Sequence, residues 1–463
     1  MATARSNTTF VPLKDRLAAG RALRGRSQRS LHGDWQPAQD RPDPIATLLE
    51  SDKGRIAALL PIRYERMRQS PFAFLRGAAS IMAWDLSRTP STGLRVQACG
   101  DCRIMNFGAF ATPERNLIFD INDFDETLPA PWEWDLKRLA VSIEVAGRSG
   151  GTKKKDRERA LRGAIAAYCE HMARYARMTA LDVWYQRIDL TELIARHPES
   201  SKERKDRDLV RKAREQAVPS HVPLTAAAKK RSHAGAGSMK IENRPPLLYH
   251  LPRQRTRRYF ARVKNALKTY RDSLPVAYRT LFDRFELRDV ALKVVGIGSV
   301  GTYCEIALFS DEQNAPLFLQ IKEARASVLE PFAGQSKFTT HGERVVAGQR
   351  LMQAASDIFL GWMVGMEPGR AFYVRQLRDM KIPMPVDAAD PADLAFFSAA
   401  CGRTLARAHA RTGEPAMIAG YLGSGAAFEG AIINFSEAYA DQTERDYAAM
   451  LKAIRQGRIK ARR

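Results

Sequence analysis

Two segments decide the fold of this chain: Ala98-Cys-Gly-Asp-Cys-Arg-Ile-Met-Asn-Phe-Gly108 and Leu117-Ile-Phe-Asp-Ile-Asn-Asp-Phe-Asp-Glu126. Together they predict a strand, a tight polar loop, a second strand, a short hairpin and an acidic cluster. Asp101 and Asn106 lie in the loop, and further aspartates follow the hairpin. In kinase-type phosphotransferases one Asp orients the acceptor hydroxyl, while an Asn and a later Asp hold Mg²⁺ against the nucleotide phosphates. The two segments therefore predict the catalytic half of a phosphoryl-transfer site.

The size and charge of the chain limit what it can be. Its 463 residues allow two or three domains, or one large two-lobed domain. A net charge of +23 attracts polyanions such as nucleic acid, an anionic membrane or nucleotide phosphates. We favour a soluble enzyme with a basic surface over a nucleic-acid-binding protein. The basic patch at Lys229-Lys-Arg231 is short and lacks interleaved aromatic residues.

The cysteines and the apolar runs indicate where the protein works. Five scattered cysteines argue against a disulfide scaffold and for a reducing compartment. Cys99 and Cys102 form a C-x-x-C pair, but no second pair accompanies them, so a metal or redox role is not favoured. The chain has no run of about 18 apolar residues and no signal-peptide core, so we expect a cytoplasmic protein without a membrane span.

A second constellation lies in the later half of the chain. Gly296, Gly298 and Gly301, with Ser299 among them, lie between two predicted strands, and a third strand ends at Lys322. A dinucleotide-binding loop would instead be followed by a helix. A strand, a Gly-rich turn, a strand, a turn and a strand that ends in Lys form the nucleotide-clamping hairpin of kinases. Glu343, on a predicted helix, is the expected partner of Lys322, and Glu323 and Glu330 are rivals for that role.

The order of the two constellations predicts the fold class. The segment after the next two strands, at Gln376 and Leu377 and on to Asp379, would be the hinge whose backbone pairs with adenine. The catalytic half thus precedes the nucleotide-clamping half. We therefore expect an α+β, two-lobed, protein-kinase-like fold that is circularly permuted, with the cut just before the catalytic loop.

This interpretation divides the chain into four parts. They are a mobile basic arm at 1–44, a catalytic and metal-binding lobe at 45–285 with helical additions and a loop near 200–245, a β-rich nucleotide-clamping lobe at 286–380, and C-terminal helices at 381–463 that pack on the catalytic lobe. Two residues keep alternatives open. Arg76 either faces a phosphate or carboxylate or forms a structural ion pair. Asp135 either caps its own helix or holds the backbone of the catalytic loop.

Six separated motifs carry a family resemblance. They are Arg66-Met-Arg-Gln-Ser-Pro-Phe-Ala-Phe-Leu-Arg-Gly77, Gly100-Asp101 with Asn106-Phe-Gly108, Asn122-Asp-Phe-Asp-Glu-Thr127, Trp134-Asp-Leu-Lys-Arg-Leu139, Tyr373-Val-Arg-Gln-Leu-Arg-Asp379 and Leu405-Ala-Arg-Ala-His-Ala-Arg411. Over about residues 45 to 455 the chain resembles the bacterial domain-of-unknown-function 2252 family. The family's motifs are in turn similar to those of aminoglycoside phosphotransferases and other small-molecule kinases.

The more distant likeness implies roles for individual residues. Asp101 matches the catalytic Asp and Asn106 the first metal ligand. The second metal ligand is Asp120 by spacing or Asp123 by its Asp-Phe setting, and the sequence leaves this open. Asp135 matches the Asp that braces the catalytic loop.

One position departs from the family pattern. Arg103 stands where the family usually has a His, two residues after the catalytic Asp. An Arg there could hold the loop through carbonyls, bind a substrate phosphate or mark a weakened enzyme.

These observations lead to one expected activity and two alternatives. We expect an ATP- and Mg²⁺-dependent phosphotransferase that acts on a hydroxyl of a small molecule. The alternatives are a pseudokinase or nucleotide-binding module, and nucleic-acid binding through the basic surface. The acceptor, the nucleotide preference and the oligomeric state are not determined by the sequence.

Overall fold

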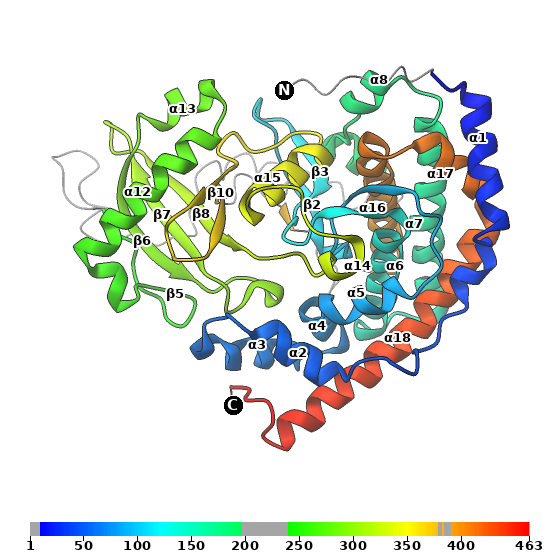
Figure 1. The fold of residues 1–463 in the computed structure, drawn as a ribbon, viewed down its shortest axis with the longest axis horizontal. Coiled ribbons are helices and arrows are strands. Elements are labelled where there is room, and N and C mark those ends of the chain that lie inside the picture. Colours follow the sequence, from blue (N-terminus) through cyan, green and yellow to red (C-terminus); the bar gives the residue numbers. More distant parts are fainter. Residues whose placement is uncertain (1–9, 197–238, 378–381, 384–389, 463) are drawn as a thin grey trace.

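An antiparallel sheet of six strands forms one side of the molecule in the computed structural model, which describes residues 10–196, 239–377, 382–383 and 390–462 (Figure 1). Across the sheet the strands run in the order β5 (Leu248–Tyr249), β6 (Glu286–Lys293), β7 (Cys304–Ser310), β8 (Pro316–Ala324), β10 (Ala371–Gln376) and β9 (Gly361–Val364). The Gly-rich segment joins β6 to β7, and a tight turn joins β7 to β8. The sheet therefore contains the predicted hairpin and third strand.

The two faces of this sheet pack against different helices. On β10, Phe372 and Val374 belong to the core that α12 (Arg257–Ser273) and α13 (Val276–Phe282) cover. Tyr373, between them, points to the other face and joins the core of the helical side. Helix α15 (His341–Met352) lies between β8 and β9 in the sequence, and it packs on that second face of the sheet. The period-two alternation of the strand thus sorts its side chains between two cores.

Long helices build the other side of the molecule (Figure 1). They are α6 (Trp132–Ser149), α7 (Lys154–Tyr175), α16 (Pro391–Thr412), α17 (Pro415–Leu422) and α18 (Ala426–Arg455). Helix α6 is buried along nearly its whole length. Helices α7 and α16 pack closely because Gly402 of α16 faces the main chain of α7, where a Cβ would lie 1.9 Å from the oxygen of Ala164.

Short elements fill the space between these two sides. The decisive segments form β1 (Arg95–Ala98), which pairs with β4 (Leu128–Pro131), and the hairpin of β2 (Phe107–Ala111) and β3 (Leu117–Ile121), with β11 (Ile382–Pro383) beside β2. The remaining helices are α2 (Pro44–Asp52), α3 (Leu60–Met67), α4 (Pro71–Gly77), α5 (Ala79–Ser87), α8 (Ala180–Tyr185), α9 (Leu190–Ala195) and α14 (Glu330–Ala333). Helices α2 and α3 run below both sides, and α3 and α4 contact the Gly-rich segment (Figure 1).

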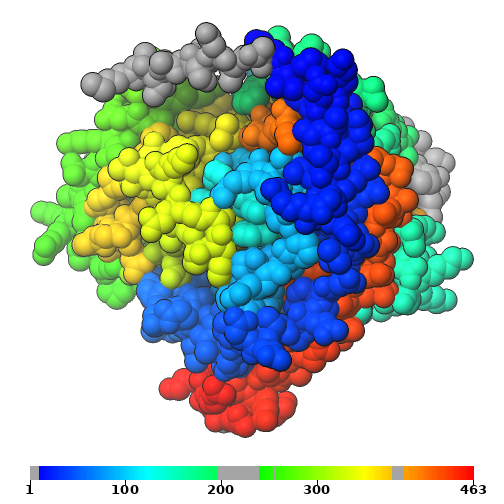
Figure 2. All heavy atoms as spheres, turned by 45° about the vertical axis from the view of Figure 1, so that its right-hand side comes forward, coloured from blue at the N-terminus to red at the C-terminus, as the bar shows by residue number. Residues whose placement is uncertain are grey.

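The segment for which a mobile arm was predicted, 1–44, packs on the helical side in its described part. Helix α1 (Leu13–Ala22) packs along α17, and the segment continues as a strip over α17 and α18 (Figures 1 and 2). The two helices touch through glycines, because a Cβ on Gly20 would lie 2.0 Å from the oxygen of Met417. Arg24 also donates to the oxygens of Gly420 and Tyr421 at the end of α17. These contacts could not be predicted from the polar composition of the segment, because they are made by main-chain atoms and glycines.

The mixed α+β class is confirmed, with more helix than strand and small sheets. Residues 197–238 of the loop predicted near 200–245, and Arg378 and Asp379 of the predicted hinge, lie outside the described residues. In the described part of the chain, no single helix is long and apolar enough to cross a membrane. Helices α17 and α18 meet at 86° and reach that length and composition only as a bent pair.

Candidate active site

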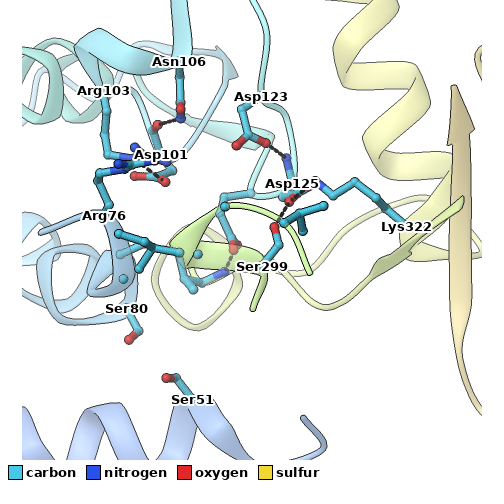
Figure 3. Close-up of a pocket in the computed structure, with 18 of the residues that line it drawn as sticks. Ser51, Arg76, Ser80, Asp101, Arg103, Asn106, Asp123, Asp125, Ser299 and Lys322 are labelled. Carbon is cyan, nitrogen blue, oxygen red and sulfur yellow. Dashed lines mark hydrogen bonds and ion pairs between the residues drawn. The ribbon is translucent and has the colours of Figure 1, made fainter. Parts of the chain in front are cut away.

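One cavity of about 210 Å³ is lined by residues from both sides of the molecule (Figure 3). The catalytic segments contribute Asp101, Arg103, Asn106, Asp123, Asp125 and Glu126; the Gly-rich segment contributes Gly296, Gly298 and Ser299; β8 contributes Lys322; and α2, α4 and α5 contribute Ser51, Arg76 and Ser80. The two predicted constellations, about 200 residues apart in the chain, therefore meet in one place.

The loop that carries Asp101 is held from α6. Asp135, in the first turn of α6, accepts hydrogen bonds from the amides of Cys99 at 2.7 Å and Gly100 at 3.0 Å. Of the two arrangements open for Asp135, the structure has the one that holds the loop. Gly100 has a φ of +81°, and a Cβ there would lie 2.3 Å from the main-chain oxygen of Glu126. This close approach brings the loop against the acidic segment.

Asp101 is a carboxylate held between two guanidinium groups. Arg103 Nε donates to its Oδ2 at 2.8 Å, and Arg138 Nη2 donates to its Oδ1 at 2.8 Å. Burial opposes ionisation, but the charges of Arg103 and Arg138 outweigh it and hold the pKa of Asp101 below its usual value. Asp101 is therefore ionised. A carboxylate with a lowered pKa is a weak base, so Asp101 is better suited to orienting a hydroxyl than to removing its proton before the hydroxyl reacts.

Asn106 and Asp123 are the described residues at this cavity that are best placed to bind a cation. Asn106 Nδ2 donates to the main-chain oxygen of Asp101 at 2.7 Å. Because the side-chain amide is planar and its nitrogen is engaged, its oxygen is left as an acceptor. The carboxylate of Asp123 is partly exposed and also lines the cavity. Amide and carboxylate oxygens are ligands that Mg²⁺ prefers.

Asp120, the alternative metal ligand, does not line the cavity. Its carboxylate accepts a hydrogen bond from Arg407 Nη2 of α16 at 2.5 Å, and both side chains are 1% exposed. The amide of Ala354 donates to its other oxygen at 2.8 Å. Asp120 and Arg407 form a buried structural ion pair. The geometry therefore favours Asp123 as the metal ligand.

Lys322 pairs with Asp125, a residue to which the sequence assigned no role. Its Nζ lies 2.7 and 3.0 Å from the two carboxylate oxygens. Tyr373, directly opposite Lys322 on β10, donates to the same carboxylate at 2.6 Å, and Ser299 donates at 3.1 Å. Burial disfavours both charged forms, but the attraction within the pair lowers the pKa of Asp125 and raises that of Lys322. The acidic segment is thus joined to the sheet and to the Gly-rich segment.

The expected pair of Lys322 and Glu343 is not formed. Glu343 lies in the first turn of α15, where Thr340 accepts a hydrogen bond from its amide at 3.1 Å. The next residue, Arg344, points toward the site and donates to the main-chain oxygens of Asp125 and Thr127. A one-residue step along a helix turns a side chain by about 100°, which spacing along the chain could not resolve. The rivals Glu323 and Glu330 do not pair with Lys322 either.

The Gly-rich segment is held beside the cavity by α3 and by the segment between α2 and α3. Residues Ile297–Ser299 form a single 3₁₀ turn. Arg55 donates to the main-chain oxygens of Gly298 at 3.0 Å and Val300 at 2.7 Å, and Arg66 donates to that of Val295. Gly296 and Gly298 line the cavity, whereas Gly301, with a φ of +88°, lies beside Arg55 and outside it.

A larger cavity of about 780 Å³ adjoins the first. Both cavities are lined by Val295, Gly296, Gln320 and Arg375. Gln376 and Leu377 line only the larger cavity, but their amides are already engaged with the Asp357 carboxylate and with the oxygen of Phe318, respectively. The amides of these two residues are therefore not available to pair with a base.

Glu126 is a second carboxyl group that sequence reasoning left without a role. Burial raises its pKa to about 7, although the amide of Val328 donates to it at 2.8 Å. It lines the cavity beside Asp125. Asp125 and Glu126 both lie in the quoted acidic segment, so their closeness to Asp123 in the sequence could have indicated that they belong to the site. Arg138 and Tyr373 lie in two of the quoted family motifs, but the sequence gave them no role, because a helix and a distant strand bring them to the site.

The C-x-x-C pair is part of the loop interior. All five cysteines are buried and unpaired. The thiols of Cys99 and Cys102 and the carboxylate of Asp135 have ligand atoms within 4.8 Å of one another. Both Asp135 oxygens already accept main-chain amides, and burial raises the pKa of each thiol. These groups are better explained as packing and support of the loop than as a metal site.

A protein-family model described as an uncharacterized protein conserved in bacteria (DUF2252) matches residues 55–453. This match covers most of the chain and includes the residues of both constellations. No curated protein and no solved structure matches the chain.

Proposed function

We propose that this chain, which belongs to the bacterial DUF2252 family, is a kinase-like phosphotransferase that moves the terminal phosphoryl group of ATP, with Mg²⁺, to a hydroxyl of a small molecule. One observation carries the proposal. The loop of Asp101 and Asn106 and the acidic segment share a cavity with Lys322 and the Gly-rich segment, and Lys322 bonds Asp125 across it. Phosphoryl transfer relies on this combination of positioned carboxylates, cations and main-chain donors.

The strand order supports a permuted kinase-like arrangement. The Gly-rich segment joins β6 to β7, Lys322 lies on β8, α15 follows, and β9 and β10 complete the same sheet. This is the succession that the nucleotide-clamping half requires. The catalytic segments precede it in the chain and lie against it in space. The proposal therefore includes the circular permutation.

The residues present fit a magnesium nucleotide. Asn106 and Asp123 would hold the ion, which when bound neutralises charge on phosphate oxygens. Lys322 and the main-chain amides of the Gly-rich segment would bind phosphate groups. Asp125 takes the role expected of Glu343, because it holds Lys322 in place. The adjoining 780 Å³ cavity has the size of a small-molecule site and would hold the nucleoside.

Asp101 would orient the acceptor hydroxyl. In the transfer, the acceptor oxygen forms a bond to phosphorus and the bond from phosphorus to the leaving oxygen of ADP breaks. The hydroxyl proton would pass first to the Asp101 carboxylate, the nearest acceptor, and from there to solvent. Because little charge develops on the attacking oxygen in a loose transition state, a carboxylate with a lowered pKa is compatible with this role.

A second candidate is a nucleotide-binding module without transfer activity. The observation in its favour is the environment of Asp101, whose two oxygens are both engaged by arginines. If these contacts persist with an acceptor present, the hydroxyl can meet only a carboxylate oxygen that already accepts a hydrogen bond from an arginine. Nucleotide binding without ADP formation across a panel of acceptors would favour this candidate.

Calorimetric titration of ATP, with and without Mg²⁺, tests the proposed nucleotide site. The wild-type chain should bind ATP in a Mg²⁺-dependent way, and Lys322→Ala should weaken binding at least about tenfold. Lys268→Ala, an exposed lysine on α12, removes the same charge outside the cavity and should bind like the wild type. The absence of binding at millimolar ATP would overturn the proposal. Asp101→Asn should bind ATP normally and lose transfer.

A further inference from the structure

The wall of the cavity beyond Asp101 is basic. Arg103 and Arg76 lie on one side of the cavity in Figure 3, and Lys322 lies on the other, with Asp101 and Asp125 between them. Arg55 and Arg63 also line the cavity, from the α2–α3 segment, and Arg55 donates to the Gly-rich segment. Since Lys322 and the Gly-rich segment are the proposed phosphate contacts of the nucleotide, Arg103 and Arg76 on the other side would face a different part of the reaction.

Arg103 has an unmet hydrogen-bonding requirement in this wall. Its side chain is 5% exposed, and its Nε is used by Asp101. Its Nη1 is buried and has no hydrogen-bond partner among the described residues. Leaving a buried guanidinium N–H unpaired is unfavourable, so a ligand acceptor atom at this point would be stabilised. A carboxylate or phosphate oxygen is the acceptor that a guanidinium binds best.

The N-terminus of α5 lines the same cavity. Ala79 and Ser80, its first two residues, line the cavity. The preceding residue is Ala78, which has no side chain to cap the first-turn amides. Such uncapped amides, together with the helix dipole, attract anions. The hydroxyl of Ser80 adds a donor at the same place.

We propose that the acceptor of the phosphoryl group is a small alcohol that carries an anionic group, a carboxylate or a phosphate, bound by Arg103, Arg76 and the first turn of α5. The inference rests on the proposed function and names its substrate class. An anion held there would leave the rest of the molecule next to Asp101, where its hydroxyl would be oriented. Neutral alcohols would be rejected, because they would leave Arg103 Nη1 unpaired.

Calorimetric titration of inorganic phosphate into the full chain tests this site. The chain is first saturated with Mg²⁺ and a non-hydrolysable ATP analogue, so that phosphate cannot occupy the nucleotide site. Phosphate should bind in the millimolar range, and both Arg103→Gln and Arg76→Gln should weaken it at least about tenfold. Arg88→Gln, which removes one charge from a surface pair with Asp40, should bind phosphate like the wild type.

The arms of this experiment separate the two proposals. Arg76→Gln leaves the hydrogen bond between Arg103 and Asp101 in place, whereas Arg103→Gln removes it. Thermal unfolding shows whether each variant is folded. Nucleotide binding without phosphate binding, or phosphate binding unchanged in both variants, would overturn the anionic acceptor and leave the phosphotransferase proposal intact. A failure of the analogue to bind would overturn both.

Discussion

Two aspartates three residues apart, Asp120 and Asp123, serve different purposes. Asp120 is closed into the protein with Arg407, whereas Asp123 faces the cavity. Spacing favoured Asp120 as the metal ligand and the Asp-Phe setting favoured Asp123, and the end of β3 at Ile121 separates the two. Asp120 lies within the paired strand, while Asp123 follows its end and is free of the ladder. The strand therefore determines which carboxylate can serve chemistry.

We predict that Asp120→Asn changes the stability of the protein, whereas Asp123→Asn changes its dependence on Mg²⁺. Asp120→Asn leaves the buried charge of Arg407 without a carboxylate and should lower the free energy of unfolding by about 3–5 kcal/mol. Asp123→Asn should change stability little and abolish the Mg²⁺ dependence of ATP binding. Urea unfolding and calorimetry measure the two effects. Normal Mg²⁺ dependence in Asp123→Asn would refute its assignment as a ligand.

Glu126 should make stability depend on pH. Its pKa is about 7 in the folded protein against an ordinary value of 4.5. Between these values the folded protein holds a proton that the unfolded chain has lost. The free energy of unfolding should therefore fall as the pH rises from 4.5 to 7, and remain lower above 7.

Glu126→Gln should flatten this profile, because the side chain can no longer ionise. Urea unfolding across the same pH window measures it. Glu50→Gln makes the same change at a side chain that is 67% exposed, and should leave the profile as in the wild type. A wild-type profile in Glu126→Gln would mean that Glu126 ionises normally in the folded protein.

At the scale of elements, glycines determine how closely the helices approach. Gly402 brings α16 onto the main chain of α7, and Gly20 with Gly420 brings α1 onto α17. The helix starts follow from local sequence, since Asp43, Ser70 and Asp390 each cap a helix whose first residue is proline. Which helices pack together does not follow from local sequence, because a contact through a glycine leaves no hydrophobic pattern along the chain.

Two glycines in the helical side should therefore respond oppositely to a methyl group. Gly402→Ala would place Cβ 1.9 Å from the oxygen of Ala164 and should lower the free energy of unfolding by about 1–3 kcal/mol. Gly430→Ala, in α18, meets no atom within 4 Å and should raise it by up to about 1 kcal/mol. Urea unfolding of both variants measures the difference. Equal stability would show that α7 and α16 can separate without loss.

At the scale of the whole molecule, the charge of +23 requires an explanation that the cavity supplies only in part. Arginines tie remote segments together through main-chain oxygens. Arg24 binds the end of α17, Arg55 binds the Gly-rich segment, and Arg344 binds the acidic segment. These guanidinium groups are structural, so a basic composition does not by itself indicate a polyanion partner.

We predict that nucleic acid binds weakly and non-specifically. Affinity for a labelled random duplex, measured by fluorescence anisotropy, should fall steeply between about 50 and 200 mM salt because binding depends on counterion release. Saturating ATP with Mg²⁺ should not displace the duplex, since the proposed nucleotide cavity is separate from the outer surface. Tight binding that persists at high salt, or competition by ATP, would instead support nucleic acid as the partner.

The sequence by itself determined the family, the mixed α+β class, and the two constellations that share a cavity. It could do so because the strand alternation, the glycines between strands and the helix caps are local signals. Only the tertiary structure decided that Asp123 rather than Asp120 faces the cavity, that Asp125 rather than Glu343 holds Lys322, and that the N-terminal segment packs on α17. These outcomes depend on which faces of distant elements meet, and on contacts to glycines and main-chain oxygens that leave no pattern along the chain.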